Sequence, residues 1–323
     1  MDLAGVWGAG QIEQRQAPPL RKLMTNLSAE AELWGNLPTS SARTVLVTIL
    51  GDSVAPLGGE IWLADLFDLT EPFGFSQRLV RTSMYRLVNE SWLENERVGR
   101  RSRYRLTQYA QLECADADLR IYRRNPRNWD GVWSLVLTET MLSSDADKRS
   151  LAKHLKWHGF VEISRGVWAV PESELGATNE LLDRLELGVR PPVAHARFDQ
   201  LTDLVDQGLF RSTFELTAAE SVYQSFLDRY REIDQAELAS SPPTEAFALR
   251  TMVVNDLRRA RLNDPDLPPA LLPNGWIGAE AFDLAGDLYR AISDRAWTAV
   301  EDATDLSLSN ADARLEGRFA VTP

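Results

Sequence analysis

A short amphipathic helix followed by an arginine-rich hairpin constrains this chain more than any other feature of its sequence. Ser76 is a suitable N-cap for a helix that ends near Ser91. The apolar positions repeat at helical spacing and should face a core: they are Val80, Met84, Leu87 and Val88. Another face of the same helix carries polar side chains, namely Gln77, Arg78, Arg81, Thr82 and Tyr85. The pattern predicts a helix with one buried side and one cationic side.

The hairpin is predicted from two segments, 93–98 and 102–107, which flank a turn at Gly99. Its arginines follow one another with no acidic residue between them, and they are Arg97, Arg100, Arg101, Arg103 and Arg105. Two earlier stretches have helical periodicity: the first begins at Ser40 or Ser41 and is ended by Gly51, and the second covers 60–69. Three helices followed by a two-stranded hairpin predict a winged helix-turn-helix over residues 39–107.

Charge decides what such a module would bind. The chain has a net charge of −12, which argues against nucleic acid, but residues 78–105 hold eight arginines and three glutamates, so the rest carries −17. A compact cationic face can bind phosphate locally on an acidic protein. The alternative is a solvated charged surface with no partner. Because helix face, hairpin and charge agree, we predict DNA contacts for Ser76, Gln77, Arg78, Arg81, Thr82, Tyr85, Arg97, Arg100, Arg101 and Arg103.

Beyond the hairpin, the pattern predicts a linker helix over 108–127 and then a separate unit over 128–200. Strands are expected at 132–138, 161–163, 167–170 and 193–198, and helices at 145–158 and 179–187. The order βαββαβ is that of a ferredoxin-like sandwich. Residues 201–302 form a helical C-terminal domain, and 303–323 form a polar tail that we expect to be frayed. Residues 1–38 form an arm that is either disordered or a short helix against a partner. The predicted fold class is α+β with several domains.

Two distant segments carry a family resemblance. The first runs from Val80 to Leu93 and continues from Val98 to Thr107. The second is the proline-rich stretch 264–273, followed by Trp276, Gly278 and the pair 288–289. Both are similar to motifs of the PaaX family of transcriptional regulators, in the same order, and the resemblance covers about residues 40–300. The long arm before Thr39 departs from the family pattern.

The resemblance implies a function and an arrangement of domains. It places a Cas2-like ferredoxin domain in the middle of the chain. It implies a cytoplasmic homodimer that represses transcription by binding a palindromic double-stranded DNA operator. The effector it implies is an aryl-CoA thioester that relieves repression, phenylacetyl-CoA in the type case, with aromatic acid catabolism as the pathway. By the same match, Arg81, Thr82 and Arg86 lie on the recognition helix, and residues 99–101 form the wing tip.

A CoA thioester needs cations for its phosphates and an apolar slot for its acyl group. The C-terminal residues that combine these properties are Arg258, Arg259, Arg261, Trp276 and Tyr289. The alternative for each is structural, because aromatic residues at helical spacing usually belong to a core. No cofactor is expected.

Two other classes of protein remain open at this stage. A metal-dependent nuclease built on the ferredoxin-like domain would need paired carboxylates near the end of its first strand, and only Glu139 lies there. His154 and His158 share a helix face that can bind zinc, but neither they nor His195 belong to a familiar ligand set. A dimeric interaction protein that does not bind DNA is the third class.

The chain carries few signals of location. One cysteine, Cys114, cannot form an intramolecular disulfide, and the first thirty residues lack the pattern of a signal peptide. The longest apolar run, residues 44–50, is too short to span a bilayer. We therefore expect a cytoplasmic protein that does not associate with membranes.

Overall fold

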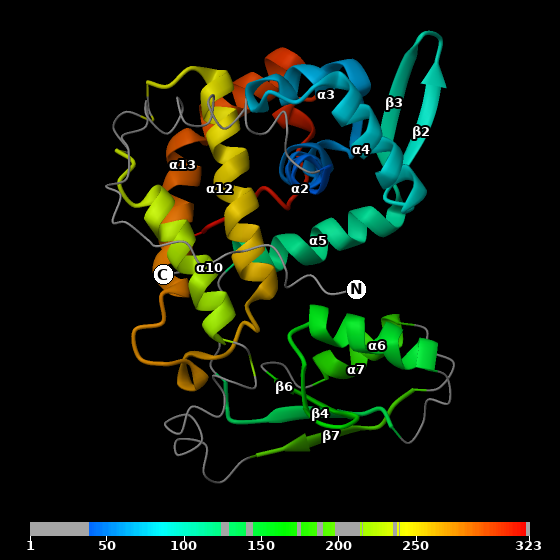
Figure 1. Cartoon of the computed structure of the whole chain (residues 1–323), viewed down its shortest axis with the longest axis vertical. Helices are drawn as coiled ribbons and strands as arrows, with labels where there is room; N and C mark the ends of the chain where they lie inside the picture. The colour runs from blue at the N-terminus through cyan, green and yellow to red at the C-terminus, as the bar shows by residue number, and fades with distance from the viewer. Residues whose placement is uncertain are drawn as a thin grey trace.

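Our computed structural model describes residues 39–123, 129–139, 145–172, 176–185, 190–197, 214, 216–234, 238 and 240–320. Helices and a hairpin from the N-terminal third lie beside the C-terminal helices, and a small sheet with two helices lies below them (Figure 1). The prediction for the arm 1–38 lies outside the described residues. None of the described helices combines the length and the apolarity needed to cross a membrane.

The N-terminal unit is the predicted winged helix, with one strand more than expected. Its elements are α2 (Thr39–Ile49), η1 (Leu50–Val54), η2 (Ala55–Leu57), β1 (Glu60–Trp62), α3 (Leu63–Thr70), η3 (Glu71–Phe73), α4 (Gln77–Asn89), β2 (Leu93–Val98) and β3 (Arg101–Leu106). β1 pairs antiparallel with β3, which lies between β1 and β2. Residues 60–62, predicted as the start of a helix, form a strand instead, and three residues are too few to show the strand period of two. Only their pairing with a strand forty residues later makes them a strand.

Gly51 does not end the first helix, so that prediction was wrong. The chain continues through it as the π-helical turn η1. A side chain at Gly51 would begin 3.7 Å from the Sγ atom of Cys114, which lies on α5 (Gln108–Tyr122). This distance is an ordinary van der Waals contact, so the packing against α5 has room for a small side chain here. α5 itself starts at the N-cap Thr107, whose hydroxyl accepts a hydrogen bond from the backbone N–H of Ala110.

The central unit has the predicted order βαββαβ. Its elements are β4 (Trp133–Leu137), α6 (Asp145–Trp157), β5 (Val161–Ser164), β6 (Val167–Pro171), α7 (Ala177–Arg184) and β7 (Val193–Ala196). The sheet is antiparallel in the order β5-β6-β4-β7, and α6 and α7 cover one face (Figure 1). Side chains of β4 point alternately to the two faces of the sheet, and each face is part of a different core. Val136 packs under the helices, whereas Trp133 packs with Leu267 and Leu271 of the C-terminal part. The ferredoxin-like prediction is confirmed.

The C-terminal helices share one core with the winged helix. They are α10 (Leu216–Tyr230), α12 (Pro243–Asn263) and α13 (Gly278–Ala303), with the short turns η4 (Pro269–Leu271) and η5 (Leu308–Asn310). α12 and α13 pack along their lengths, and α12 also contacts α2 and α5. A single cluster of buried apolar side chains runs from Ala42 to Phe319. The winged helix is therefore packed directly on the helical domain rather than linked to it by a hinge.

The tail from 303 onward is not frayed over its described part, so that prediction was wrong. The N–H of Phe319 donates to the carbonyl of Tyr122 at 2.9 Å, and the N–H of Asp312 donates to the carbonyl of Pro56 at 2.9 Å. Phe319 is buried among aromatic rings of α5 and α13. The segment has no helical or strand periodicity, so its anchoring to distant residues was invisible to pattern analysis.

The deepest anchor of the tail is a buried charge network around Asp52. The guanidinium of Arg318 lies 3.0 Å from one carboxylate oxygen, and that of Arg250 lies 3.2 Å from the other. The hydroxyls of Tyr122 and Tyr289 donate to the first oxygen at 2.7 and 3.2 Å. Burial opposes ionisation, but Arg250 and Arg318, together with hydrogen bonds from Tyr122 and Ser53, hold the pKa of Asp52 below its usual value. Asp52 is therefore a carboxylate whose stability in the core depends on all of these partners.

We predict that Arg318→Met destabilises the protein by about 3–5 kcal/mol, because removing one partner leaves a buried charge uncompensated. Urea unfolding would measure the change in the free energy of unfolding. Arg231→Met is the matched control: Arg231 pairs with Glu280 at the surface, and such pairs contribute about 0–1 kcal/mol. Equal effects of the two substitutions would contradict the assignment.

We also predict a pH-dependent stability from His158. Burial lowers the pKa of this imidazole from 6.5 to about 4, although Asp116 opposes the shift. The unfolded chain therefore binds a proton that the folded chain does not, and stability falls as the pH drops from about 6.5 towards 4. His158→Gln should reduce the loss of melting temperature between pH 7 and pH 5. If the variant lost as much melting temperature between pH 7 and pH 5 as the unsubstituted protein, the prediction would be wrong.

Candidate DNA-binding surface

Helix α4 is built so that one side is fixed in the core and the other is open. The hydroxyl of its N-cap, Ser76, accepts a hydrogen bond from the backbone N–H of Leu79 at 3.3 Å. The buried side consists of Val80, Ser83, Met84 and Leu87. The exposed side consists of Gln77, Arg78, Arg81, Thr82, Tyr85 and Arg86. The predicted division of the helix into a core face and a polar face is therefore what the structure has.

The exposed side chains of α4 differ in how they are held. The guanidinium of Arg81 lies over the ring of Phe67 on α3, 4.9 Å from its centroid, which supports the side chain while leaving it exposed. Tyr85 is 65% exposed, an unusual position for so large a ring. Among the described residues, Arg78 and Arg86 have no carboxylate within ion-pair distance. This face thus offers unneutralised cations and an aromatic ring to a partner.

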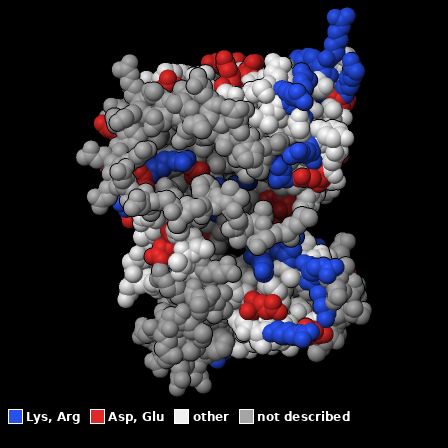
Figure 2. Space-filling model, in the orientation of Figure 1, with Lys and Arg blue, Asp and Glu red and all other residues white. Residues whose placement is uncertain are grey.

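The wing ends in a tight turn. Strands β2 and β3 pair from Leu93 opposite Leu106 to Val98 opposite Arg101. This pairing leaves a two-residue loop, Gly99-Arg100. Gly99 has φ +62°, which a glycine adopts at the first position of such a turn without strain. The hairpin stands out from the body beside α4, and lysine and arginine side chains gather at this end (Figures 1 and 2). Residues 94–100 are all exposed.

The arginines of strand β3 are used differently from those of the turn. Arg103 forms ion pairs with Glu96 at 2.6 Å and Glu60 at 3.1 Å, and Arg105 pairs with Glu60 at 2.5 Å. Arg101 lies over the ring of Trp62, 4.2 Å from its centroid, and also pairs with Asp65 on α3 at 3.4 Å. The role of Glu60 could not be predicted, because it depends on the pairing of strand β1 with β3. A DNA contact by Arg103 stays a prediction, and it would have to compete with two carboxylates.

The turn keeps its positive charge. Arg97 donates to the carbonyl of Gly99 at 3.3 Å, which directs its side chain along the loop. Arg100 is exposed, and in the described part of the chain it meets no carboxylate. The wing is therefore cationic at its tip and largely neutralised at its base. A duplex held by both elements would meet α4 and residues 97–101.

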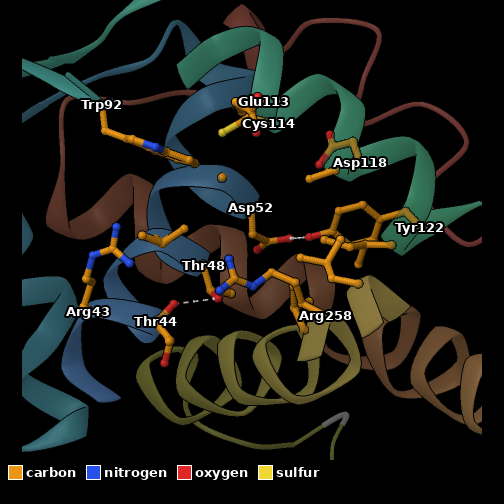
Figure 3. A pocket seen from close by; sticks show the side chains of 16 residues that line it. Arg43, Thr44, Thr48, Asp52, Trp92, Glu113, Cys114, Asp118, Tyr122 and Arg258 are labelled. Atoms are coloured by element: carbon orange, nitrogen blue, oxygen red, sulfur yellow. Dashed lines mark hydrogen bonds between the residues drawn. The ribbon is translucent and has the colours of Figure 1, made fainter. Parts of the chain in front are cut away.

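The five predicted ligand-binding residues do not converge on one site. Tyr289 belongs to the Asp52 network, and Trp276 packs edge-on against Tyr223. Arg261 donates to the backbone carbonyl of Arg120 at 2.8 Å, and Arg259 is exposed on α12. Arg258 lines a cavity of about 220 Å³ to which α2 and α5 also contribute (Figure 3). Tyr289, Trp276 and Arg261 therefore make contacts within the protein that fit a structural role, the alternative to ligand binding.

The residue on which the nuclease hypothesis depended is already engaged. Glu139 accepts a hydrogen bond from Arg165 at 2.9 Å and from Lys148 at 3.1 Å, and these bonds lower the pKa of its carboxyl. In the portion of the chain that the structure describes, no three His, Cys, Asp or Glu side chains gather as a metal site. His195 lies 2.8 Å from the carboxylate of Glu172 instead.

These elements define the class of the protein: an α+β protein with a winged helix, a ferredoxin-like unit and a helical C-terminal part. Three family models match it in that order. They describe a PaaX-like protein over residues 41–110, the central Cas2-like domain of the PaaX protein over 126–206, and the PaaX-like C-terminal domain over 214–302. The chain belongs to the PaaX family, as the two sequence motifs indicated.

Two known proteins are similar to it. The transcriptional repressor PaaX of Escherichia coli (strain K12) is 32% identical over 283 residues, which cover 84% of this chain and 87% of the repressor. Among solved structures, the uncharacterized protein Rv0674 from Mycobacterium tuberculosis is 22% identical, with a TM-score of 0.48 over 80% of this chain and 96% of that protein.

We predict that the double substitution Arg100→Ala with Arg101→Ala weakens binding to any duplex. The slope of log K against log salt should fall by about one for each phosphate that the variant no longer binds. A fluorescence anisotropy titration of a random 20-base-pair duplex at several salt concentrations measures it. Arg105→Ala, on the same hairpin but paired with Glu60, is the control and should change the slope less. An unchanged slope in the double variant would contradict the wing contact.

Proposed function

We propose that this chain is a transcriptional repressor that binds an operator in double-stranded DNA. The observation that carries the proposal is the joint exposure of the polar face of α4 and the cationic turn at one end of the molecule. An α-helix fits the major groove, and an arginine-bearing turn suits phosphates or a narrow minor groove. The acidic remainder of the chain limits non-specific binding. That the E. coli relative is named a transcriptional repressor supports the same function.

The contacts divide by position. Arg78, Arg81 and Tyr85 read bases or phosphates from α4, with Gln77 and Thr82 beside them. The wing residues Arg97, Arg100, Arg101 and Arg103 supply phosphate contacts. The protein acts as a homodimer on a palindromic site, so each recognition helix reads one half-site. It is a regulator rather than an enzyme.

The proposed signal is an aromatic acid derivative, an aryl-CoA thioester by the family resemblance, and the regulated genes serve the catabolism of aromatic acids of the phenylacetate type. A ligand that binds the folded state raises its melting temperature. A thermal-shift screen of aryl-CoA thioesters and of free aromatic acids therefore identifies the effector independently of DNA.

We expect a gel-shift assay with fragments of the upstream region of the regulated genes to give a retarded, uncleaved complex, with or without EDTA. Arg78→Ala should weaken this specific complex by about 1–3 kcal/mol, roughly a 5- to 150-fold loss of affinity. Arg231→Ala, which removes an exposed arginine from the C-terminal part, should leave it unchanged. Metal-dependent cleavage would favour a nuclease, and no binding to any duplex would favour an interaction protein.

A further inference from the structure

A cavity of about 700 Å³ lies between α5 and the central unit, where α6 and β5 form part of its wall. Its volume is in the upper half of the range of about 300–1,000 Å³ that small-molecule and cofactor sites occupy. The cavity beside Arg258, at about 220 Å³, has room for little more than one aromatic ring. In Figure 1, α6 lies opposite α5, so a ligand in the larger cavity touches both the central unit and the helix that follows the wing.

The wall that α6 supplies is cationic. Lys153 and Lys156 line the cavity and are exposed, and Arg149 is exposed one turn earlier on the same side of the helix. Among the described residues these three lie beyond ion-pair distance of any carboxylate, unlike Lys148 of the same helix, which pairs with Glu139 at 3.1 Å. Lysine and arginine side chains gather over this helix in Figure 2. A row of such cations suits a ligand that carries several phosphates.

The carboxylates at the cavity do not cancel this charge. Glu162 accepts a hydrogen bond at 2.8 Å from a backbone N–H of the turn between β5 and β6. Asp264 is buried and accepts a hydrogen bond from the hydroxyl of Tyr223 at 2.6 Å. Burial raises the pKa of Glu113 although Lys153 opposes the shift, so this carboxyl holds its charge less firmly than an exposed one. The two lysines are therefore open to an anionic ligand.

Another part of the wall is aromatic and belongs to the base of the wing. The rings of Trp92 and Tyr109 meet edge to face, with centroids 6.4 Å apart. Tyr109 is 48% exposed, so much of its ring is open to a ligand. Phe160 and Phe214 add buried apolar surface to the same cavity. A flat apolar group can pack against these rings while the charged part of the same molecule reaches α6.

We propose that this cavity is the effector site, and that an aryl-CoA thioester binds in it with two separate roles for its two ends. The phosphates lie along Lys153 and Lys156, with the nucleotide extending towards Arg149, and the acyl ring packs against Trp92 and Tyr109. This inference rests on the proposed function, to which it adds the site. The nucleotide anchors the ligand, whereas the aryl group carries the signal. A free aromatic acid has no phosphates and can use only part of the site.

Trp92 connects the cavity to the recognition helix. Its N–H donates to the carbonyl of Leu87 on α4 at 2.9 Å, and its carbonyl accepts from the N–H of Thr107 at 3.1 Å. Thr107 follows the last strand of the wing and caps α5. A ring packed against Trp92 therefore acts on the point where α4, the wing and α5 are held together. Because a ligand shifts an equilibrium only through different affinities for two states, CoA without the ring has little effect there.

Calorimetry on the full chain tests the binding with CoA, benzoyl-CoA, phenylacetyl-CoA and the two free acids. We expect at least one thioester to bind about tenfold more tightly than CoA, because its ring is buried. The free acids should bind about a hundredfold more weakly than the thioesters, because they lack the phosphates. A chain that binds neither CoA nor a thioester would contradict the proposal, as would a free acid that binds as tightly as its thioester.

Substitutions on the two walls separate the two roles. Lys153→Met and Lys156→Met should each weaken the binding of CoA and of the thioester by the same factor, about five- to tenfold. Lys148→Met, which changes the paired lysine of the same helix, is the control and should change neither affinity. Equal effects of Lys148→Met and Lys153→Met would show that only the general charge of the helix matters and would rule out the site.

The aromatic wall has its own variant. Tyr109→Ala should weaken binding of the thioester about fivefold and leave that of CoA unchanged. Leu112→Ala is the control, because this side chain is 62% exposed on the next turn of α5 and does not line the cavity. A Tyr109 variant that binds the thioester as well as the unsubstituted protein does would disprove the placement of the acyl ring.

A duplex titration with and without ligand tests the coupling. We expect the thioester to weaken duplex binding at least tenfold, CoA to change it little, and Tyr109→Ala to reduce the response. Loss of duplex affinity in the lysine variants without any ligand would assign the lysines to DNA phosphates and overturn the effector site. CoA that acts as strongly as the thioester would overturn the role of the ring. If the chain binds no duplex at all, the repressor proposal fails while the calorimetric results still decide the site.

Discussion

The buried carboxylate of Asp52 is the interaction on which the arrangement of this protein depends. It lies in the π-helical turn after α2 and is bound by side chains from α5, α12, α13 and the tail. With Asp118 as a second carboxylate, two negative and two positive charges balance in a region closed to water. Such a cluster is tolerated only in one geometry, because each charge has lost its hydration. It therefore fixes the angle at which the winged helix is held.

A consequence is that the DNA-binding surface is not an independent module. Its core is continuous with that of the C-terminal helices, and the cavity bounded by Arg43 and Arg258 lies on the shared boundary. Packed interfaces change between discrete arrangements rather than deforming smoothly.

Local patterns sufficed for some parts of the molecule. The faces of α4, its Ser76 cap, the hairpin and the βαββαβ order could be predicted because each depends on spacing within a few residues. The rest depends on contacts between distant residues. Strand β1 exists because of β3, and the ion pairs of Arg103 need Glu60. Arg258 lines a cavity together with Arg43, and this neighbour could not be predicted because the two residues lie over two hundred positions apart in the sequence.

The contact between residues 52 and 318 spans nearly the whole polypeptide. During synthesis the winged helix leaves the ribosome before the C-terminal helices, yet Asp52 has no guanidinium from the tail until Arg318 has been made. Contacts of such long sequence separation form late, because the entropy of closing the loop must first be overcome. The candidate DNA-binding surface is thus translated well before the tail residue that completes the charge network beneath it.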